Sequence, residues 1–125
     1  MSDRGRVLIV DDDRSVVKML NVRLQAEGYR TELAVDGATA LKLAEEYRPD
    51  VILLDLAMPT VTGADVLNEL KASPCGRDLP VVIITAYPHM IEVVKGNDSV
   101  KGCFVKPFDM SKLVATIKEI VSGGD

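Results

Sequence analysis

Acidic residues follow two apolar segments that have the composition of buried strands. Val7–Val10 is followed by three aspartates, residues 11–13, and Val51–Leu54 is followed by Asp55. Carboxylates that meet at one crevice repel each other, and a bound magnesium ion, which prefers oxygen ligands, relieves that repulsion. A carboxylate in such a site can attack phosphorus to give an aspartyl phosphate. The spacing therefore favours phosphoryl transfer to an aspartate.

Two further polar residues stand at the ends of later apolar segments. Thr85 follows Val81–Ile84, and Lys106 follows Gly102–Val105. A lysine charge and a threonine hydroxyl together suit an anion such as a phosphoryl group. Taken singly, these residues have structural explanations, because the aspartates can cap turns or helices, the threonine can end a strand and the lysine can be solvated. Their occurrence at successive strand ends favours one shared site.

Helical segments alternate with the strand-like ones. We predict strands at residues 6–10, 31–35, 51–54, 81–84 and 102–105, and helices at 14–27, 38–47, 63–72 and 110–121, with one or two helical turns at 90–94. This alternation predicts an open, doubly wound parallel sheet with helices on both faces, whose site lies at the carboxyl ends of the strands. The length of 125 residues suits one domain and is too short for an eight-stranded barrel.

Composition excludes several other classes of protein. The net charge of -4, without a run of Lys or Arg, argues against binding of nucleic acid by this domain. No apolar run approaches the roughly 20 residues that span a bilayer, and the N-terminus lacks a signal peptide, so we expect a cytoplasmic location and no membrane binding. Cys75 and Cys103 lack a C-x-x-C spacing and are expected to be free thiols.

Four motifs together resemble the receiver domain of two-component response regulators. They are Val7-Leu8-Ile9-Val10-Asp11-Asp12-Asp13, Val51-Ile52-Leu53-Leu54-Asp55-Leu56-Ala57-Met58-Pro59, Ile84-Thr85-Ala86 and Val105-Lys106-Pro107-Phe108. The resemblance covers nearly the whole chain, so residues 1–125 are expected to form a single receiver domain. It implies a flavodoxin-like five-stranded parallel sheet with strand order 2-1-3-4-5.

The resemblance also implies a role for each acidic residue of the site. Asp55 is the expected phosphoacceptor and a magnesium ligand. Asp12 would bind Mg²⁺ directly, whereas Asp11 would bind it through water or act as a charge partner. The main-chain carbonyl of Ala57 would be a further ligand. These assignments make Mg²⁺ the expected cofactor.

The same resemblance assigns the remaining polar residues and the partners. Thr85 would hydrogen-bond the phosphoryl group, Lys106 would pair with it, and the Lys106–Pro107 peptide would be cis. The donor would be a histidine kinase or a histidine phosphotransfer protein, and the output an unidentified downstream protein or effector domain. The chain would be a signalling domain and not an enzyme, beyond its own phosphorylation and dephosphorylation.

Three features depart from the family pattern. Cys103 stands where receivers usually carry an aromatic residue that follows the state of the threonine, and Phe104 cannot replace it because neighbouring strand residues face opposite sides. We expect Cys103 to be a small buried residue. Residues 88–100 contain Pro88, Gly96 and Asn97–Asp98, which predict a short, displaced or irregular fourth helix. Thr62 replaces a common aspartate, a change that the following glycine should tolerate.

The remaining polar residues receive structural interpretations, and two rival functions stay open. Asp65 and Asp109 are assigned to helix starts, and His89 to the solvent. One rival is a pseudo-receiver that signals without phosphorylation. The other is a haloacid-dehalogenase-type phosphohydrolase that uses Asp11 and Asp13, although Asp55 would then lack a role and the chain is short for that class.

Overall fold

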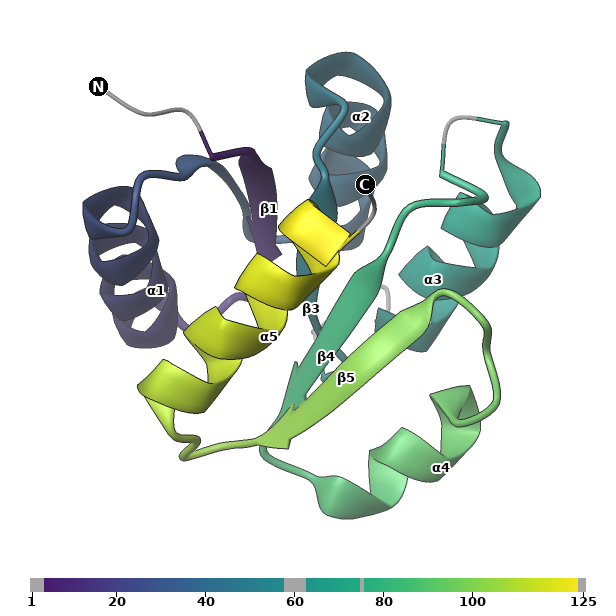
Figure 1. The fold of residues 1–125 in the computed structure, drawn as a ribbon. Coiled ribbons are helices and arrows are strands. Elements are labelled where there is room, and N and C mark those ends of the chain that lie inside the picture. Colours follow the sequence, from purple (N-terminus) through teal and green to yellow (C-terminus); the bar gives the residue numbers. More distant parts are fainter. Residues whose placement is uncertain (1–3, 58–62, 75, 124–125) are drawn as a thin grey trace.

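Five strands alternate with helices along the chain (Figure 1). The computed structural model describes residues 4–57, 63–74 and 76–123. All five predicted strands are present, with bounds that differ by at most two residues. Among the described helices, none has the length and apolar composition needed to cross a membrane. The elements are β1 (Arg6–Val10), α1 (Arg14–Ala26), β2 (Arg30–Ala34), α2 (Gly37–Tyr47), β3 (Val51–Asp55), α3 (Gly63–Ala72), β4 (Val81–Thr85), the 3₁₀ turn η1 (Pro88–Met90), α4 (Ile91–Val94), β5 (Val100–Val105) and α5 (Met110–Gly123).

The strands form one parallel sheet in the order β2-β1-β3-β4-β5. This is the order that the resemblance implies. Val10 of β1 is level with Leu54 of β3, and Leu54 is level with Ile83 of β4. The residues that follow these positions therefore meet at one edge of the sheet, which is where ligand sites of such folds lie.

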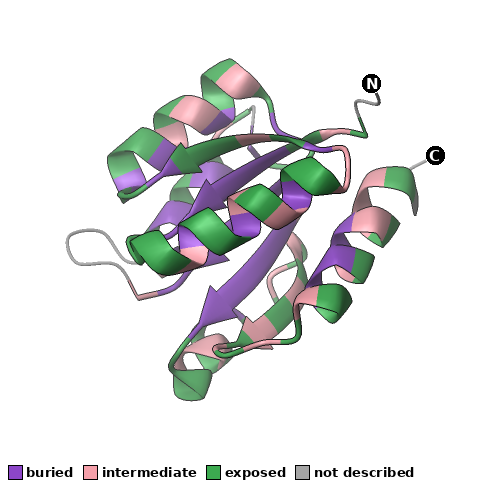
Figure 2. Cartoon of the chain, turned by 90° about the vertical axis from the view of Figure 1, so that its left-hand side faces the viewer, coloured by how far each residue is buried: buried purple, intermediate pink, exposed green. Residues whose placement is uncertain are grey.

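Apolar layers on both faces of the sheet form the core. One layer joins the sheet to α1 and α5, and the other joins it to α2, α3 and Val94 of α4. Every residue of β3 and β4 is buried (Figure 2). Because a strand covered on both sides has no solvent face, these two strands are apolar almost throughout and do not alternate. They hold the edge that carries the site in a fixed position.

Aspartates define the starts of several helices. The carboxylate of Asp13 accepts hydrogen bonds from the N–H groups of Ser15 and Val16, and the carboxylate of Asp109 accepts them from Ser111 and Lys112. The assignment of Asp109 to a helix start is therefore confirmed. Asp65 lies in the first turn of α3, as expected.

The fourth helix is short, as the sequence predicts. Together η1 and α4 span only residues 88–94, and Gly96 follows with a φ of 94°. The expectation of a buried Cys103 is wrong, because this thiol is free and exposed. Cys103 pairs in register with Ile83, on the sheet face that carries α4, and the single turn of α4 leaves it uncovered at the edge strand. The predictions for Thr62 and Cys75 lie outside the described residues.

An ion-pair cluster ties the end of α1 to α5. The carboxylate of Glu27, which follows α1, lies 3.0 Å from Lys118 Nζ of α5 and 3.1 Å from Arg23 Nε. The hydrogen bond from Lys118, followed by that from Arg23, holds the pKa of Glu27 below its usual value. A carboxylate whose pKa is lowered by folding stabilises the fold at neutral pH, and this contribution is lost as the pH falls through the folded-state pKa.

We predict that Glu27→Gln lowers the thermal unfolding midpoint at pH 7 and that the difference from the native chain shrinks below pH 4.5, the ordinary pKa of this carboxyl group. Thermal unfolding followed by circular dichroism at several pH values measures it. Glu46→Gln, at an exposed position of α2, is the matched control and should change the midpoint less at pH 7. A Glu27→Gln effect that grows at low pH would contradict the ion-pair explanation.

Candidate functional site

Three polar side chains are buried among the described residues, and all three were predicted site residues. Asp11 and Thr85 are fully buried, and Asp55 is 3% exposed. They follow or end β1, β4 and β3, at the edge where the carboxyl ends of these strands meet. Burial of a charged or polar group costs free energy unless it is paired, so each must be explained by its partners.

Asp55 is held by its own chain and by Lys106. Its Oδ1 accepts a hydrogen bond of 3.1 Å from the N–H of Ala57, and its Oδ2 lies 3.5 Å from Lys106 Nζ. Burial raises the pKa of Asp55 to about 6. The N–H of Ala57 and the charge of Lys106 oppose this shift, whereas the negative charge of Asp11 adds to it. A cation bound at the site would, like Lys106, favour the ionised form of Asp55.

Lys106 lies closer to Asp11 than to Asp55. Its Nζ is 2.7 Å from Asp11 Oδ2, and its side chain is largely buried. Burial alone would lower the pKa of Lys106, but the hydrogen bond and charge of Asp11, together with Asp55, raise it on balance. The main-chain N–H of Lys106 also donates to the carbonyl of Thr85 over 2.7 Å, which anchors the lysine to β4. The peptide bond to Pro107 is cis, as expected.

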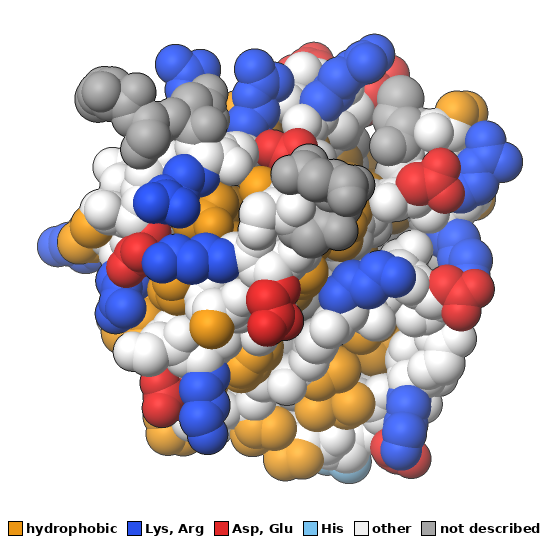
Figure 3. All heavy atoms as spheres, in the orientation of Figure 1, with side chains coloured by type: hydrophobic (Ala, Val, Ile, Leu, Met, Phe, Trp, Pro, Cys, Tyr) orange, Lys and Arg blue, Asp and Glu red, His pale blue; other side chains and the backbone are white. Residues whose placement is uncertain are grey.

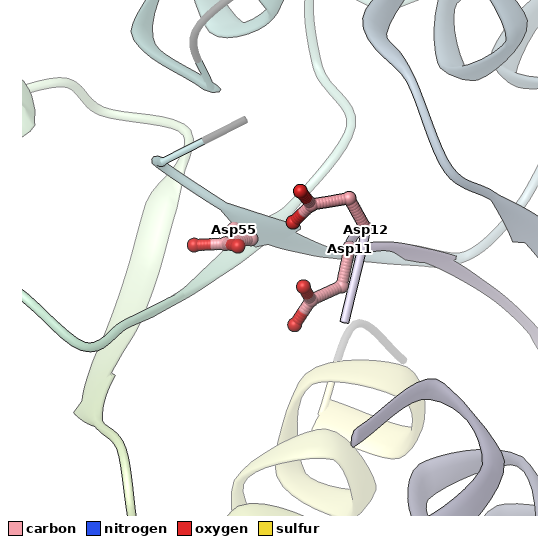
Figure 4. Close-up of side chains that lie close together, drawn as sticks. All are labelled: Asp11, Asp12 and Asp55. Atoms are coloured by element: carbon pink, nitrogen blue, oxygen red, sulfur yellow. The ribbon is translucent and has the colours of Figure 1, made fainter. Parts of the chain in front are cut away.

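Asp11, Asp12 and Asp55 form a cluster with the donors that Mg²⁺ prefers (Figure 4). Each offers a carboxylate oxygen, and these oxygens lie within 4.8 Å of one another. Asp12 is exposed whereas its two neighbours are buried, so the cluster opens to solvent on one side. Three carboxylates and one lysine give a formal charge of -2. A divalent cation fits both the oxygen donors and this charge.

The hydroxyl of Thr85 is engaged by the segment that follows it. Thr85 Oγ1 accepts a hydrogen bond of 3.0 Å from the N–H of Tyr87 and is 3.5 Å from the carbonyl oxygen of the same residue. The structure therefore places Thr85 at the predicted sheet edge with its hydroxyl bound to Tyr87. Its role toward a phosphoryl group stays a prediction, as does the role of the Ala57 carbonyl.

Asp13 does not share the environment of Asp11. Its carboxylate caps α1 and is exposed, whereas Asp11 Oδ1 accepts the main-chain N–H of Asp13 over 2.9 Å. The phosphohydrolase interpretation needs the carboxylates of both Asp11 and Asp13 for chemistry. Here the carboxylate of Asp13 instead caps α1, as one of the structural explanations for the aspartates in the sequence allowed.

Gly63 brings the start of α3 against the backbone that carries Asp55. The N–H of Gly63 donates to the carbonyl of Leu56 over 2.9 Å. A Cβ atom at this position would lie 2.3 Å from the carbonyl oxygen of Asp55 and 2.6 Å from the Cα of Leu56, far inside van der Waals contact. The glycine therefore sets how closely α3 approaches the candidate nucleophile.

Sequence reasoning did not assign a functional role to two residues near the site. Gly63 was noted only for permitting a turn, and its close approach to β3 depends on the packing of α3. Tyr87 was not singled out. A threonine whose side chain binds the main chain two residues later is a known local motif, so the Thr85–Tyr87 spacing was the available signal.

Comparisons with known proteins agree with this geometry. The family model described as the response regulator receiver domain matches residues 7–118. The DNA-binding response regulator MtrA of Mycolicibacterium smegmatis is 40% identical over 116 residues, which are 92% of this chain and 50% of MtrA. The chain thus spans about half the length of the curated relatives that it matches.

Solved structures of receiver proteins have the same fold. The chemotaxis protein CheY4 of Vibrio cholerae superposes with a TM-score of 0.83 at 31% identity, covering 96% of this chain and 99% of CheY4. The receiver domain of the sensor histidine kinase PA1611 of Pseudomonas aeruginosa gives a TM-score of 0.85 at 27% identity, covering 94% and 97% of the two chains. That structure has a magnesium ion coordinated in its active-site cleft.

We predict that Gly63→Ala destabilises the fold by roughly 1–3 kcal/mol or more, because main-chain atoms of β3 cannot move aside as the end of a side chain can. Urea unfolding measures the change. Gly102→Ala is the matched control, because a Cβ there meets only the Thr116 methyl at 3.3 Å and the Phe104 ring at 3.6 Å. Equal stability of the two variants would contradict the close approach of α3.

Proposed function

Because this chain belongs to the response regulator receiver domain family, we propose that it accepts a phosphoryl group on Asp55, with Mg²⁺ bound by the neighbouring aspartates, and thereby switches a protein–protein interaction. The observation that carries this proposal is the coincidence of burial and charge at one sheet edge. The two buried carboxylates of the described residues, Asp11 and Asp55, share one lysine there. A structural core has no need of such an arrangement, whereas an aspartyl nucleophile does.

The side chains of the site suit attack on a phosphohistidine. An Asp55 oxygen would form the new bond to phosphorus as the P–N bond breaks, and the electron pair would leave with the imidazole. The N–H of Ala57 fixes the carboxylate through Oδ1. Lys106, whose Nζ is 3.5 Å from Asp55 Oδ2, is within reach of the charge on the incoming group. A bound magnesium ion would neutralise negative charge on the phosphoryl oxygens.

We assign the metal ligands by their place around Asp55. Asp12, the exposed member of the cluster, would contact the ion directly, together with Asp55 and the carbonyl of Ala57. Asp11 is already engaged by Lys106 and the N–H of Asp13, so a water-mediated contact or a charge effect suits it better.

The partners follow from this chemistry and from the family. The donor would be a histidine kinase or a histidine phosphotransfer protein, and the output a downstream protein or an effector domain. MtrA is named as a DNA-binding response regulator, but the net charge of -4, without a run of Lys or Arg, argues against binding of nucleic acid by this domain itself. We propose a single receiver domain over residues 1–125 that works in the cytoplasm, with no catalytic activity toward a separate substrate.

We predict that acetyl phosphate with Mg²⁺ phosphorylates the native chain once and that Asp55→Asn abolishes this modification. Intact-protein mass spectrometry measures it, and peptide mapping locates the modified residue. Asp13→Asn is the matched control, because asparagine can also cap α1 and the position is outside the carboxylate cluster. Modification that survives Asp55→Asn but not Asp11→Asn would replace the receiver interpretation with the phosphohydrolase one.

We also predict that Asp12→Asn weakens Mg²⁺ binding by about tenfold or more, since even the loss of a group that only supports a metal ligand commonly has that effect. Isothermal titration calorimetry measures the affinity. Asp13→Asn should bind Mg²⁺ nearly as the native chain does. Absence of millimolar-range binding by the native chain would favour the pseudo-receiver instead.

A further inference from the structure

The short segment between β1 and α1 carries two of the three carboxylates of the site. Asp11 and Asp12 are its first two residues, and Asp13 is the N-cap of α1. Figure 4 shows the side chains of Asp11 and Asp12 leaving this segment on the side of Asp55. The course of the main chain over residues 11–13 therefore decides where these two carboxylates lie.

The carboxylate of Asp11 is held from two directions. Its Oδ2 lies 2.7 Å from Lys106 Nζ, and its Oδ1 accepts the N–H of Asp13 over 2.9 Å. The N–H of Asp11 itself donates to the carbonyl of Ala34, at the end of β2, over 3.1 Å. The lysine is a flexible side chain from another part of the fold, whereas the N–H of Asp13 belongs to the main chain two residues further on. The orientation of the Asp11 carboxylate therefore depends on where the peptide of Asp13 is held.

Asp13 is in turn held by the first turn of α1. Its Oδ1 accepts the N–H groups of Ser15 and Val16 over 3.0 and 3.3 Å, and its carbonyl accepts the N–H of Val17 over 3.0 Å. The side-chain bonds satisfy N–H groups that have no partner within the helix. Val17 packs in the core layer of α1 and α5 and is 7% exposed. The cap thus ties the peptide of Asp13 to an element that is anchored in the core.

We propose that Asp13 is a positioning residue for the metal site, because its cap of α1 holds its own N–H against Asp11 and thereby fixes the carboxylates of Asp11 and Asp12 for Mg²⁺. This inference rests on the proposed function. Asp13 acts through its two neighbours, since its own carboxylate is turned to α1 and lies outside the carboxylate cluster. Asp12 is placed with them, because both of its neighbours in the chain are anchored.

The physical basis is preorganisation of the segment. Without an acceptor at position 13, the N–H groups of Ser15 and Val16 lose their partner and the first turn of α1 frays. The peptide at position 13 then gains freedom, and its bond to Asp11 is broken part of the time. Binding of the ion has to order the segment again, and this cost reduces the affinity. Loss of a group that supports a metal ligand commonly weakens binding by about tenfold or more.

A second capping aspartate provides the matched comparison. Asp36 caps α2, where its Oδ1 accepts the N–H of Thr39 over 2.8 Å, and α2 contributes no residue to the candidate site. Both Asp13 and Asp36 are exposed. Asp36→Ala therefore removes one charge and one helix cap, as Asp13→Ala does, but leaves residues 11–13 unchanged.

Isothermal titration calorimetry of the full chain with magnesium chloride tests the proposal. Thermal unfolding followed by circular dichroism first shows that each variant is folded at the temperature of the titration. We expect Asp13→Ala to bind Mg²⁺ about tenfold more weakly than the native chain. Asp13→Asn, which keeps a side-chain oxygen for the cap, should bind nearly as the native chain does. Asp36→Ala should lower the unfolding midpoint and leave the affinity for Mg²⁺ nearly unchanged.

The charged side chains of the surface favour a clear titration. Among the described residues, Figure 3 shows Lys and Arg side chains interspersed with Asp and Glu, so the face in view has no extended acidic surface that would bind Mg²⁺ outside the site. Mg²⁺ affinity of Asp13→Ala equal to that of the native chain overturns the proposal. Equal weakening in Asp13→Asn would assign the effect to charge, and equal weakening in Asp36→Ala to a general loss of stability. Either result also overturns it.

Carbon-13 NMR without metal separates this proposal from the proposed function. The signal of the Asp11 carboxyl carbon, identified by its loss in Asp11→Asn, should move in Asp13→Ala and stay in place in Asp13→Asn and Asp36→Ala at the same pH. If the native chain binds no Mg²⁺ in the titration, the metal site of the proposed function fails. The Asp11 signal still decides the link between the cap and the carboxylate, because an unchanged signal in Asp13→Ala overturns it and a displaced one supports it.

Discussion

The structure depends on one lysine that pairs with two buried carboxylates. Asp11 and Asp55 would each be costly to bury alone, and their mutual repulsion adds to that cost. Lys106, which directly follows β5, contacts Asp55 past β4 and Asp11 past β4 and β3. Its main-chain N–H is bonded to the carbonyl of Thr85 at the end of β4. The ends of β1, β3 and β5 are thus joined by charge as well as by the sheet. The position and charge of the carboxylates at the site depend on this lysine.

The two sides of the site differ in how firmly they are held. On one side, Gly63 brings α3 against the backbone of Asp55 so closely that a methyl group has no room. On the other side, a 3₁₀ turn and a single helical turn cover the end of β4, and Cys103, Val93 and Val105 stay exposed. The site is therefore tightly packed toward α3 and loosely covered toward α4.

The strands and most residues of the site could be predicted from the sequence, because the patterns that identify them are local. Apolar segments such as Val51–Leu54 predict buried strands, and parallel topology then places the polar residues that follow them at one edge. The exposure of Cys103 could not be predicted, because it depends on how far α4 extends over β5. The sequence also could not predict that Lys106 lies closer to Asp11 than to Asp55. The two contacts, of 2.7 and 3.5 Å, differ by only 0.8 Å and join distant parts of the chain.

The formal charge of the site has a consequence for the groups that the site would attract once it is phosphorylated. With a divalent cation bound, the three carboxylates and the lysine sum to zero. Conversion of a carboxylate into an acyl phosphate dianion would leave the same set of groups with one negative charge in excess. The phosphorylated site would then carry an uncompensated negative charge, and an additional cation or hydrogen-bond donor would bind there favourably. A domain built in this way would be most receptive to a partner offering positive charge or hydrogen-bond donors during the interval before hydrolysis restores neutrality.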